Sequence, residues 1–226
     1  MGRRLIPCLA VVASLLAAGC AARKSSLTAA DYRERAGDPR KIGILMVGTG
    51  VRHLHAGGGS SPDTERGAQC AACAVEAVGQ ALAGRGYEAA ALPLDRDYLL
   101  FLAAYRQVRD DLFNAAPSDT RTLPGLAPLP SGPALCAKNG VDALIVVGAC
   151  DQHFPEGGRA VFWDQAVLRI YFGRGAAYAD LAAVDCTGRI IHYGRESGSY
   201  CTLSDEAGVH QVFDDLVAGL PPSGPR

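Results

Sequence analysis

The apolar run from Val141 to Cys150, VDALIVVGAC, constrains the fold of this chain more than any other segment. Such a run without polar alternation is typical of a strand buried on both faces, because helices cover both sides of its sheet. Residues 41–48, KIGILMVG, have the same character and predict a second buried strand that ends at glycine. We therefore predict an α/β (α+β) fold, in which helices pack on a mixed sheet with a central buried strand.

Helical periodicity predicts helices between and after these strands. The predicted helices span 62–83, 95–114, 134–139 and 205–218, and a further strand is predicted at 87–94. The second helix has its large apolar side chains on one face: Tyr98, Phe101, Leu102, Tyr105 and Leu112. Ser61 can cap the first helix, and Pro62 suits its first position because no backbone donor is needed there.

The C-terminal half predicts an antiparallel meander. Its strands span 161–172, 176–185 and 189–200, separated by glycine-containing turns. Two-residue turns would pair Asp180 with Arg169 on one neighbouring strand and with Arg195 on the other. The opposite face would then be apolar, which supports this register, since a slip of one residue exchanges the faces. The row Arg169–Asp180–Arg195 is interpreted as a solvated salt-bridge ladder or, alternatively, as a partner-binding patch.

The N-terminal segment has the pattern of an export signal. Arg3 and Arg4 precede the apolar residues 5–16, a run shorter than the roughly 18–20 residues that span a bilayer. The sequence LAAGC at 16–20 then matches the lipobox of bacterial lipoproteins, in which the cysteine is acylated and becomes the new N-terminus. We predict a signal peptide at 1–19 and a lipidated Cys20; an ordinary secretory signal cleaved near Ala18 is the alternative. Ala21, in place of an aspartate, favours the outer membrane, with the protein on its periplasmic side.

Composition and charge set the remaining organisation. We predict a flexible tether at 20–40, one periplasmic domain at 41–220 and a tail at 221–226, because residues 21–40 are polar and end in Gly-Asp-Pro. A proline-rich loop at 115–133 is long enough to predict a functional role, and with the charged row it is a predicted contact surface. The formal net charge is −1 and no basic stripe occurs, so no nucleic-acid partner is expected.

Four short motifs carry a family resemblance. They are KIGIL at 41–45, QALAGRGY at 80–87, GVDALIVVG at 140–148 and AVDCTGRI at 183–190. With the lipobox, they resemble the periplasmic domains of the CsgG, LpoB and TolB N-terminal type, which occur in bacterial outer-membrane lipoproteins. The resemblance implies assembly, adaptor or activator roles through oligomers or partner proteins, and it carries over no catalytic residue or cofactor. The proline-rich loop and the cysteines depart from the family pattern.

The cysteines offer one candidate for chemistry, the pair Cys70 and Cys73. A redox-active pair lies at a helix N-terminus, where the helix dipole lowers the pKa of a thiol. This pair lies in the second or third turn of the predicted helix, so we favour ordinary helix residues or an incidental disulfide. A bridge between Cys150 and Cys186 is not expected, because the two cysteines lie two strands apart if the central strand neighbours the predicted strand 161–172.

Two loops contain histidines that could bind a metal. His53 and His55 lie in a glycine-rich segment, and His153 lies with Asp151 and Glu156 after the central strand. Neither loop has a complete ligand set, so we predict solvated loops, no metal and no cofactor. The sequence favours a non-enzymatic envelope adaptor, anchored in the membrane by lipid, that binds envelope proteins or itself. The alternative is an envelope thiol-redox or metal-dependent enzyme.

Overall fold

The computed structural model describes residues 23–32, 39–54, 60–115, 122–153, 177–198, 203 and 206–220. Several predictions concern residues outside these ranges: the signal peptide 1–19, Cys20, His55, Glu156, the strand 161–172 with Arg169 and the tail 221–226. No helix among the described residues is both long and apolar enough to cross a membrane.

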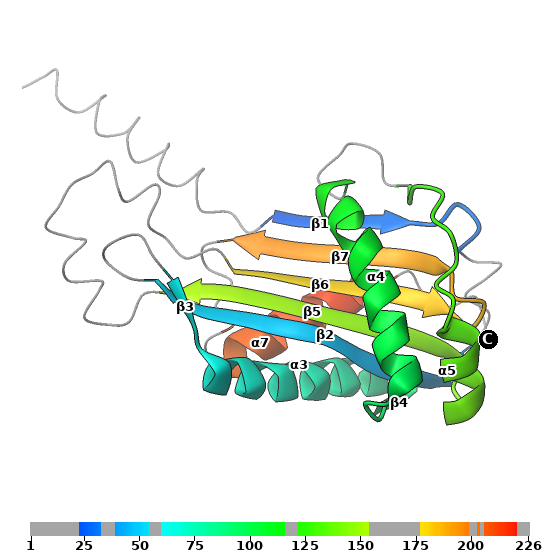
Figure 1. The fold of residues 1–226 in the computed structure, drawn as a ribbon, viewed down its shortest axis with the longest axis horizontal. Helices are drawn as coiled ribbons and strands as arrows, with labels where there is room; N and C mark the ends of the chain where they lie inside the picture. Colours follow the sequence, from blue (N-terminus) through cyan, green and yellow to red (C-terminus); the bar gives the residue numbers. More distant parts are fainter. Residues whose placement is uncertain are drawn as a thin grey trace, which may run out of the picture.

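The described strands form one seven-stranded sheet (Figure 1). The strands are β1 (Arg23–Thr28), β2 (Lys41–Leu54), β3 (Ser60–Pro62), β4 (Glu88–Ala91), β5 (Ala143–His153), β6 (Ala177–Asp185) and β7 (Ile190–Gly198). Their order is β1-β7-β6-β5-β2-β3, and β4 pairs with the beginning of β2. β5 is parallel to β2 and antiparallel to β6, so the predicted mixed sheet with a central buried strand is confirmed.

Four helices of the described chain cover the two faces of this sheet (Figure 1). They are α3 (Thr64–Gly84), α4 (Arg96–Ala115), α5 (Gly132–Asn139) and α7 (Glu206–Ala218). On β5, Leu144 and Val146 pack with the side chains of α4 and α5, whereas Ile145 and Val147 pack with those of α3 and α7. Burial on both faces explains why the central strand is apolar without alternation.

The first helix begins later than Ser61, the predicted cap. β2 continues to Leu54, and β3 pairs antiparallel with its end, so part of the predicted glycine-rich loop is strand. Asp63 is therefore the N-cap of α3, and its Oδ1 accepts a hydrogen bond of 3.1 Å from the backbone N–H of Arg66. Pro62 is the last residue of β3, just before this cap. At the end of a strand, the missing backbone N–H of proline removes little of the hydrogen bonding between strands.

The prediction of a tether is wrong for residues 23–28. These residues form β1, an outer strand that pairs antiparallel with β7 over its whole length. Leu27 is buried beside Tyr193, and Lys24 Nζ lies 2.5 Å from Asp215 Oδ2 of α7. A strand with a single large apolar side chain resembles a solvated linker in sequence, because its backbone pairing leaves no composition signal.

A disulfide joins Cys136 of α5 to Cys186, which lies in the turn after β6. Cys150 and Cys186 form no bridge, as expected, but the expected separation by two strands is wrong. β5 pairs directly with β6, and Cys150 pairs with Tyr178 at the end of β6 opposite to Cys186. The described part of the proline-rich loop approaches the same turn: the backbone N–H of Leu129 donates to the carbonyl of Gly188 over 2.6 Å. Leu129 is buried, so this end of the loop is packed against the domain.

Candidate functional site

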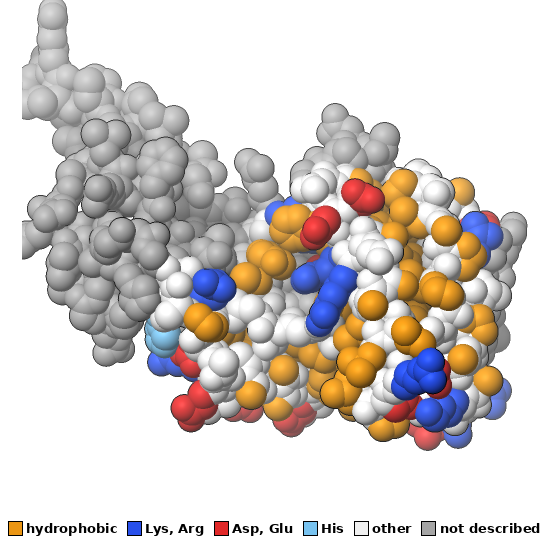
Figure 2. Space-filling model, in the orientation of Figure 1, with side chains coloured by type: hydrophobic (Ala, Val, Ile, Leu, Met, Phe, Trp, Pro, Cys, Tyr) orange, Lys and Arg blue, Asp and Glu red, His pale blue; other side chains and the backbone are white. Residues whose placement is uncertain are grey.

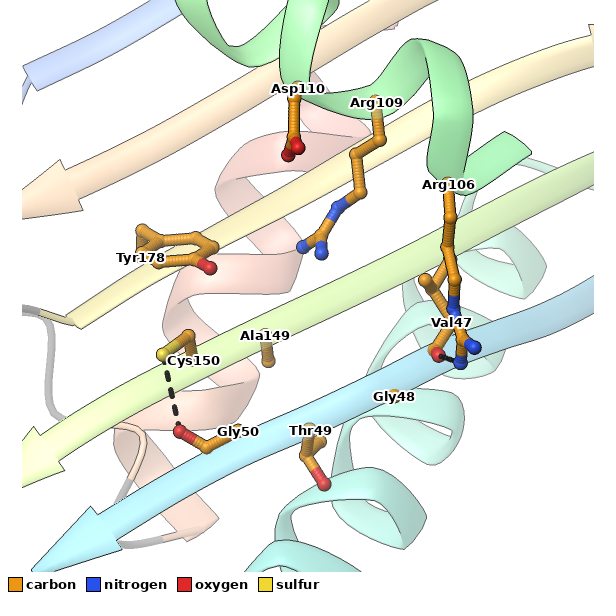
Figure 3. Close-up of a pocket in the computed structure, with 10 residues that line it drawn as sticks. All are labelled: Val47, Gly48, Thr49, Gly50, Arg106, Arg109, Asp110, Ala149, Cys150 and Tyr178. Atoms are coloured by element: carbon orange, nitrogen blue, oxygen red, sulfur yellow. Dashed lines mark hydrogen bonds between the residues drawn. The ribbon is translucent and has the colours of Figure 1, made fainter. Parts of the chain in front are cut away.

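A hollow of about 390 Å³ lies between α4 and the C-terminal halves of β2 and β5. α4 crosses the sheet obliquely and leaves these parts of the strands uncovered (Figure 1). Figure 2 shows basic and acidic side chains close together at the centre of this face. The lining residues are Val47, Gly48, Thr49, Gly50, Arg106, Arg109, Asp110, Ala149, Cys150 and Tyr178 (Figure 3).

Glycines form the floor of the hollow and fix its shape. Gly48 and Gly50 are exposed to solvent, so backbone atoms of β2 are accessible there. Gly48 follows a register shift in β2 and has a φ of 139°, a conformation that side chains disfavour. A Cβ at Gly148 would lie 2.6 Å from Asp180 Oδ1 and would also collide with Arg109. Glycine at this position therefore makes room for the ion pair between those two residues.

That ion pair joins α4 to β6 beside the hollow. Arg109 Nε donates to Asp180 Oδ2 over 2.9 Å, and Arg109 Nη2 donates to Asp180 Oδ1. The Asp180 side chain is fully buried, whereas 19% of the Arg109 side chain is exposed. Burial alone would lower the pKa of the Arg109 guanidinium, but the hydrogen bond and charge of Asp180 outweigh it and raise that pKa. Arg109 is thus a fixed cation at the edge of the hollow.

The buried position of Asp180 corrects the interpretation of the charged row. Asp180 and Arg195 are register partners on β6 and β7, as predicted. Asp180, however, is covered by α4 and pairs with Arg109, so it is part of neither a solvated ladder nor an exposed patch. The strand register could not reveal this, because it says nothing about a helix that covers the face. Arg169 lies outside the described residues.

Arg195 holds the C-terminal end of α4. Its Nη1 donates to the carbonyl of Phe113 over 2.7 Å, and its Cζ lies 3.3 Å from the centroid of the Phe113 ring. A cation at a helix C-terminus stabilises the free carbonyl groups there. Arg195 therefore fastens α4 to the sheet.

The walls of the hollow carry groups suited to recognition. Arg106 is exposed and points toward the strands, where its Nη2 donates to the carbonyl of Val47 over 2.7 Å (Figure 3). On the other side, the ring of Tyr178 lies 4.8 Å from that of Phe113, and Arg109 Cζ lies 5.9 Å from the Tyr178 centroid. Asp110 adds an exposed carboxylate. A ligand in the hollow would meet a guanidinium, an aromatic ring and a carboxylate.

The thiol in the hollow is not activated. Cys150 Sγ donates to the carbonyl of Gly50 over 3.2 Å. Burial raises the pKa of the Cys150 thiol, so the thiol is protonated near neutral pH. A protonated thiol is a weak nucleophile, so Cys150 lines the hollow but is not expected to react with a ligand there.

Cys70 and Cys73 are both free thiols on α3, which packs on the opposite face of the sheet. Cys70 is buried, and this burial, together with the nearby charge of Asp151, raises the pKa of its thiol to about 12. Redox-active thiols have the opposite shift, toward lower pKa values. The environment of Cys70 therefore disfavours the redox alternative.

The described parts of the histidine loops do not assemble a metal site. His53 Nε2 lies 2.7 Å from Asp63 Oδ2, so this histidine contacts the cap of α3. His153 is the register neighbour of His53 on β5, and Asp151 is buried. Among the described residues, no group of three or more His, Cys, Asp or Glu side chains could hold a metal ion.

Sequence reasoning missed Arg106, Arg109, Asp110 and Tyr178 as residues of one site. One signal was available: Arg109 falls on the apolar stripe of α4, between Tyr105 and Leu112. A charged residue on a buried helix face requires a buried partner of opposite charge.

Comparison with known proteins gives distant structural similarity. No protein-family model and no curated protein matches the sequence. Among solved structures, the chain is similar to the PelC dodecamer from Paraburkholderia phytofirmans, in its unsubstituted form and as a point variant. The identities are 8% and 9%, with a TM-score of 0.38 and coverage of 88% of this chain and 96% of the other in both cases.

Proposed function

We propose that this protein is a lipid-anchored adaptor of the cell envelope with no catalytic activity of its own, and that the hollow beside α4 binds its partner. Acylated Cys20 would hold it at the outer membrane, on the periplasmic side. Its partners would be envelope proteins or a second copy of the chain. The basic N-terminus, apolar run and lipobox, in register at 1–20, support this anchor.

The observation that carries the proposal is the composition of the hollow. Arg and aromatic side chains are enriched at protein interfaces, where they form the energetically dominant contacts. Here Arg106 and Tyr178 stand over a floor of exposed backbone at Gly48 and Gly50. Arg109 is held by Asp180, so this side of the site is formed before a partner arrives, and binding loses less side-chain freedom. Arg106 would pair with a carboxylate of the partner.

A second exposed surface fits the same function. Leu94, two residues before α4, and Leu99 and Leu100 in α4 are 71%, 56% and 50% exposed. Exposed leucines so close in sequence favour contact with another protein, because their burial removes apolar area from water. The enzymatic alternative is weaker, since the pKa values of the Cys70 and Cys150 thiols are raised and not lowered.

The anchor is tested by replacing the acylated residue. Cys20→Ala should move the protein from the membrane fraction to the soluble fraction and abolish the incorporation of labelled fatty acid, because acyl chains supply the membrane affinity. Cys73→Ala, which removes a half-buried thiol of α3, is the matched control and should change neither result. A Cys20→Ala protein that still sediments with membranes and still carries label would contradict the anchor.

The hollow is tested by site-specific photo-crosslinking in intact cells. A photoreactive amino acid at Asp110, which lines the hollow, should give a discrete cross-linked product, whereas the same group at exposed Asp111 should not. Arg106→Glu should reduce that product about tenfold or more, the loss typical of a central interface arginine. Arg96→Glu, at the exposed start of α4, is the control for charge. Equal products from both positions, or no effect of Arg106→Glu, would overturn the assignment.

A further inference from the structure

The distance between the lipid anchor and the sheet is short. β1 begins at Arg23, and only Ala21 and Ala22 separate it from Cys20. Three residue steps of at most ~3.6 Å place Arg23 within about 11 Å of the Cys20 Cα, whatever path the chain takes. A folded strand, and not a long tether, therefore starts beside the acylated residue.

The first residue of β1 lies in the same row of the sheet as the hollow. Arg23 pairs with Ser197, and Ser197 pairs with Tyr178. Tyr178 pairs in turn with Cys150, and Cys150 with Gly50. Neighbouring strands are about 4.8 Å apart, so these last three residues lie roughly 10, 14 and 19 Å from Arg23. All three line the hollow.

β1 is held firmly enough to transmit this constraint. It pairs with β7 from Arg23 to Thr28, and Leu27 is buried in the core. Lys24 Nζ lies 2.5 Å from Asp215 Oδ2 of α7 and 3.7 Å from Glu196 Oε2 of β7. The backbone N–H of Leu123 donates to the carbonyl of Thr28 over 3.2 Å on the other edge of the strand.

We propose that β1 is a rigid link that keeps the hollow close to the membrane, within about 30 Å of the acylated cysteine, the sum of the chain reach and the strand spacings. The hollow then takes a protein segment that lies within this distance of the same membrane, because the domain cannot extend farther. This inference rests on the proposed function, since it requires an acylated Cys20. The inference adds the location of the partner's binding segment, which must lie close to the membrane.

Energy transfer to labelled lipid tests the link. The acylated protein is placed in vesicles of phosphatidylethanolamine and phosphatidylglycerol that contain a headgroup-labelled acceptor lipid. A donor dye is attached through a non-canonical amino acid either at Gln107, exposed on α4 beside the hollow, or at Ala134, exposed on α5. Transfer should be stronger from Gln107, because α5 lies at the opposite end of the strands (Figure 1).

An insertion separates the link from the anchor. Twenty-four Gly-Ser residues between Ala22 and Arg23 would add roughly 25–30 Å of root-mean-square reach and should lower transfer from Gln107 at least about twofold. The melting temperature is the control that the insertion leaves the fold intact. A bound protein whose transfer is unchanged by the insertion, or is no stronger from Gln107 than from Ala134, overturns the rigid link and leaves the anchor standing. If the protein without the insertion fails to float with vesicles, the lipid anchor is overturned, and the rigid link is overturned with it.

Discussion

Replacing Asp180 with alanine is expected to lower the free energy of unfolding by about 3–5 kcal/mol, the usual cost of leaving one member of a buried ion pair without its partner. Asp180 is fully buried, and it accepts two hydrogen bonds from Arg109. The Arg109 side chain is 19% exposed, so it regains little hydration when the carboxylate is lost. Urea unfolding followed by far-ultraviolet circular dichroism measures the change as a lower midpoint.

Two further variants separate the ion pair from the space it fills. Asp180→Leu combined with Arg109→Met removes both charges and should recover most of the lost stability, because no unpaired charge remains. Asp110→Ala, which removes an exposed carboxylate from the next position of α4, should change the free energy of unfolding by less than about 0.5 kcal/mol. The buried-pair interpretation is wrong if Asp180→Ala unfolds at the wild-type midpoint, or if the double variant is no more stable than the single one.

The sequence was sufficient where the signal is local. The apolar face predicted for the second helix is the face that α4 buries: Tyr98, Phe101, Leu102, Tyr105 and Leu112. The run from Val141 to Cys150 likewise predicted the central strand, because a strand covered on both faces needs apolar side chains at consecutive positions. Patterns of this kind follow from the helix and strand periods alone.

The sequence was insufficient where the partner is distant. Arg109 and Asp180 are 71 positions apart, and the sequence around each residue does not indicate which distant residue it pairs with. β1 was missed because its backbone pairing with β7 stabilises it, and backbone hydrogen bonds require no particular pattern of side chains. The hollow has no sequence signature of its own, since it exists only because α4 leaves part of β2 and β5 uncovered.

Breaking the disulfide between Cys136 and Cys186 is expected to lower the free energy of unfolding by about 4 kcal/mol, if its effect is to restrict the unfolded chain. The two cysteines are 50 positions apart, so the bridge closes a long loop. It also holds α5 beside the turn after β6, where the backbone N–H of Leu129 donates to the carbonyl of Gly188. The double variant Cys136→Ser/Cys186→Ser, unfolded in urea beside the wild type, measures this loss.

Chemical reduction distinguishes the bridge from the serines that replace it. A thiol reductant should lower the wild-type midpoint to that of the double variant and should not change the double variant itself. Cys73→Ser, at a half-buried free thiol, should retain most of the wild-type stability and the full response to reductant. A wild-type midpoint that is insensitive to reductant would show that the bridge contributes nothing. The expected response links stability to location, because a disulfide of this kind persists in the oxidising envelope, where the proposed lipid anchor would place the protein.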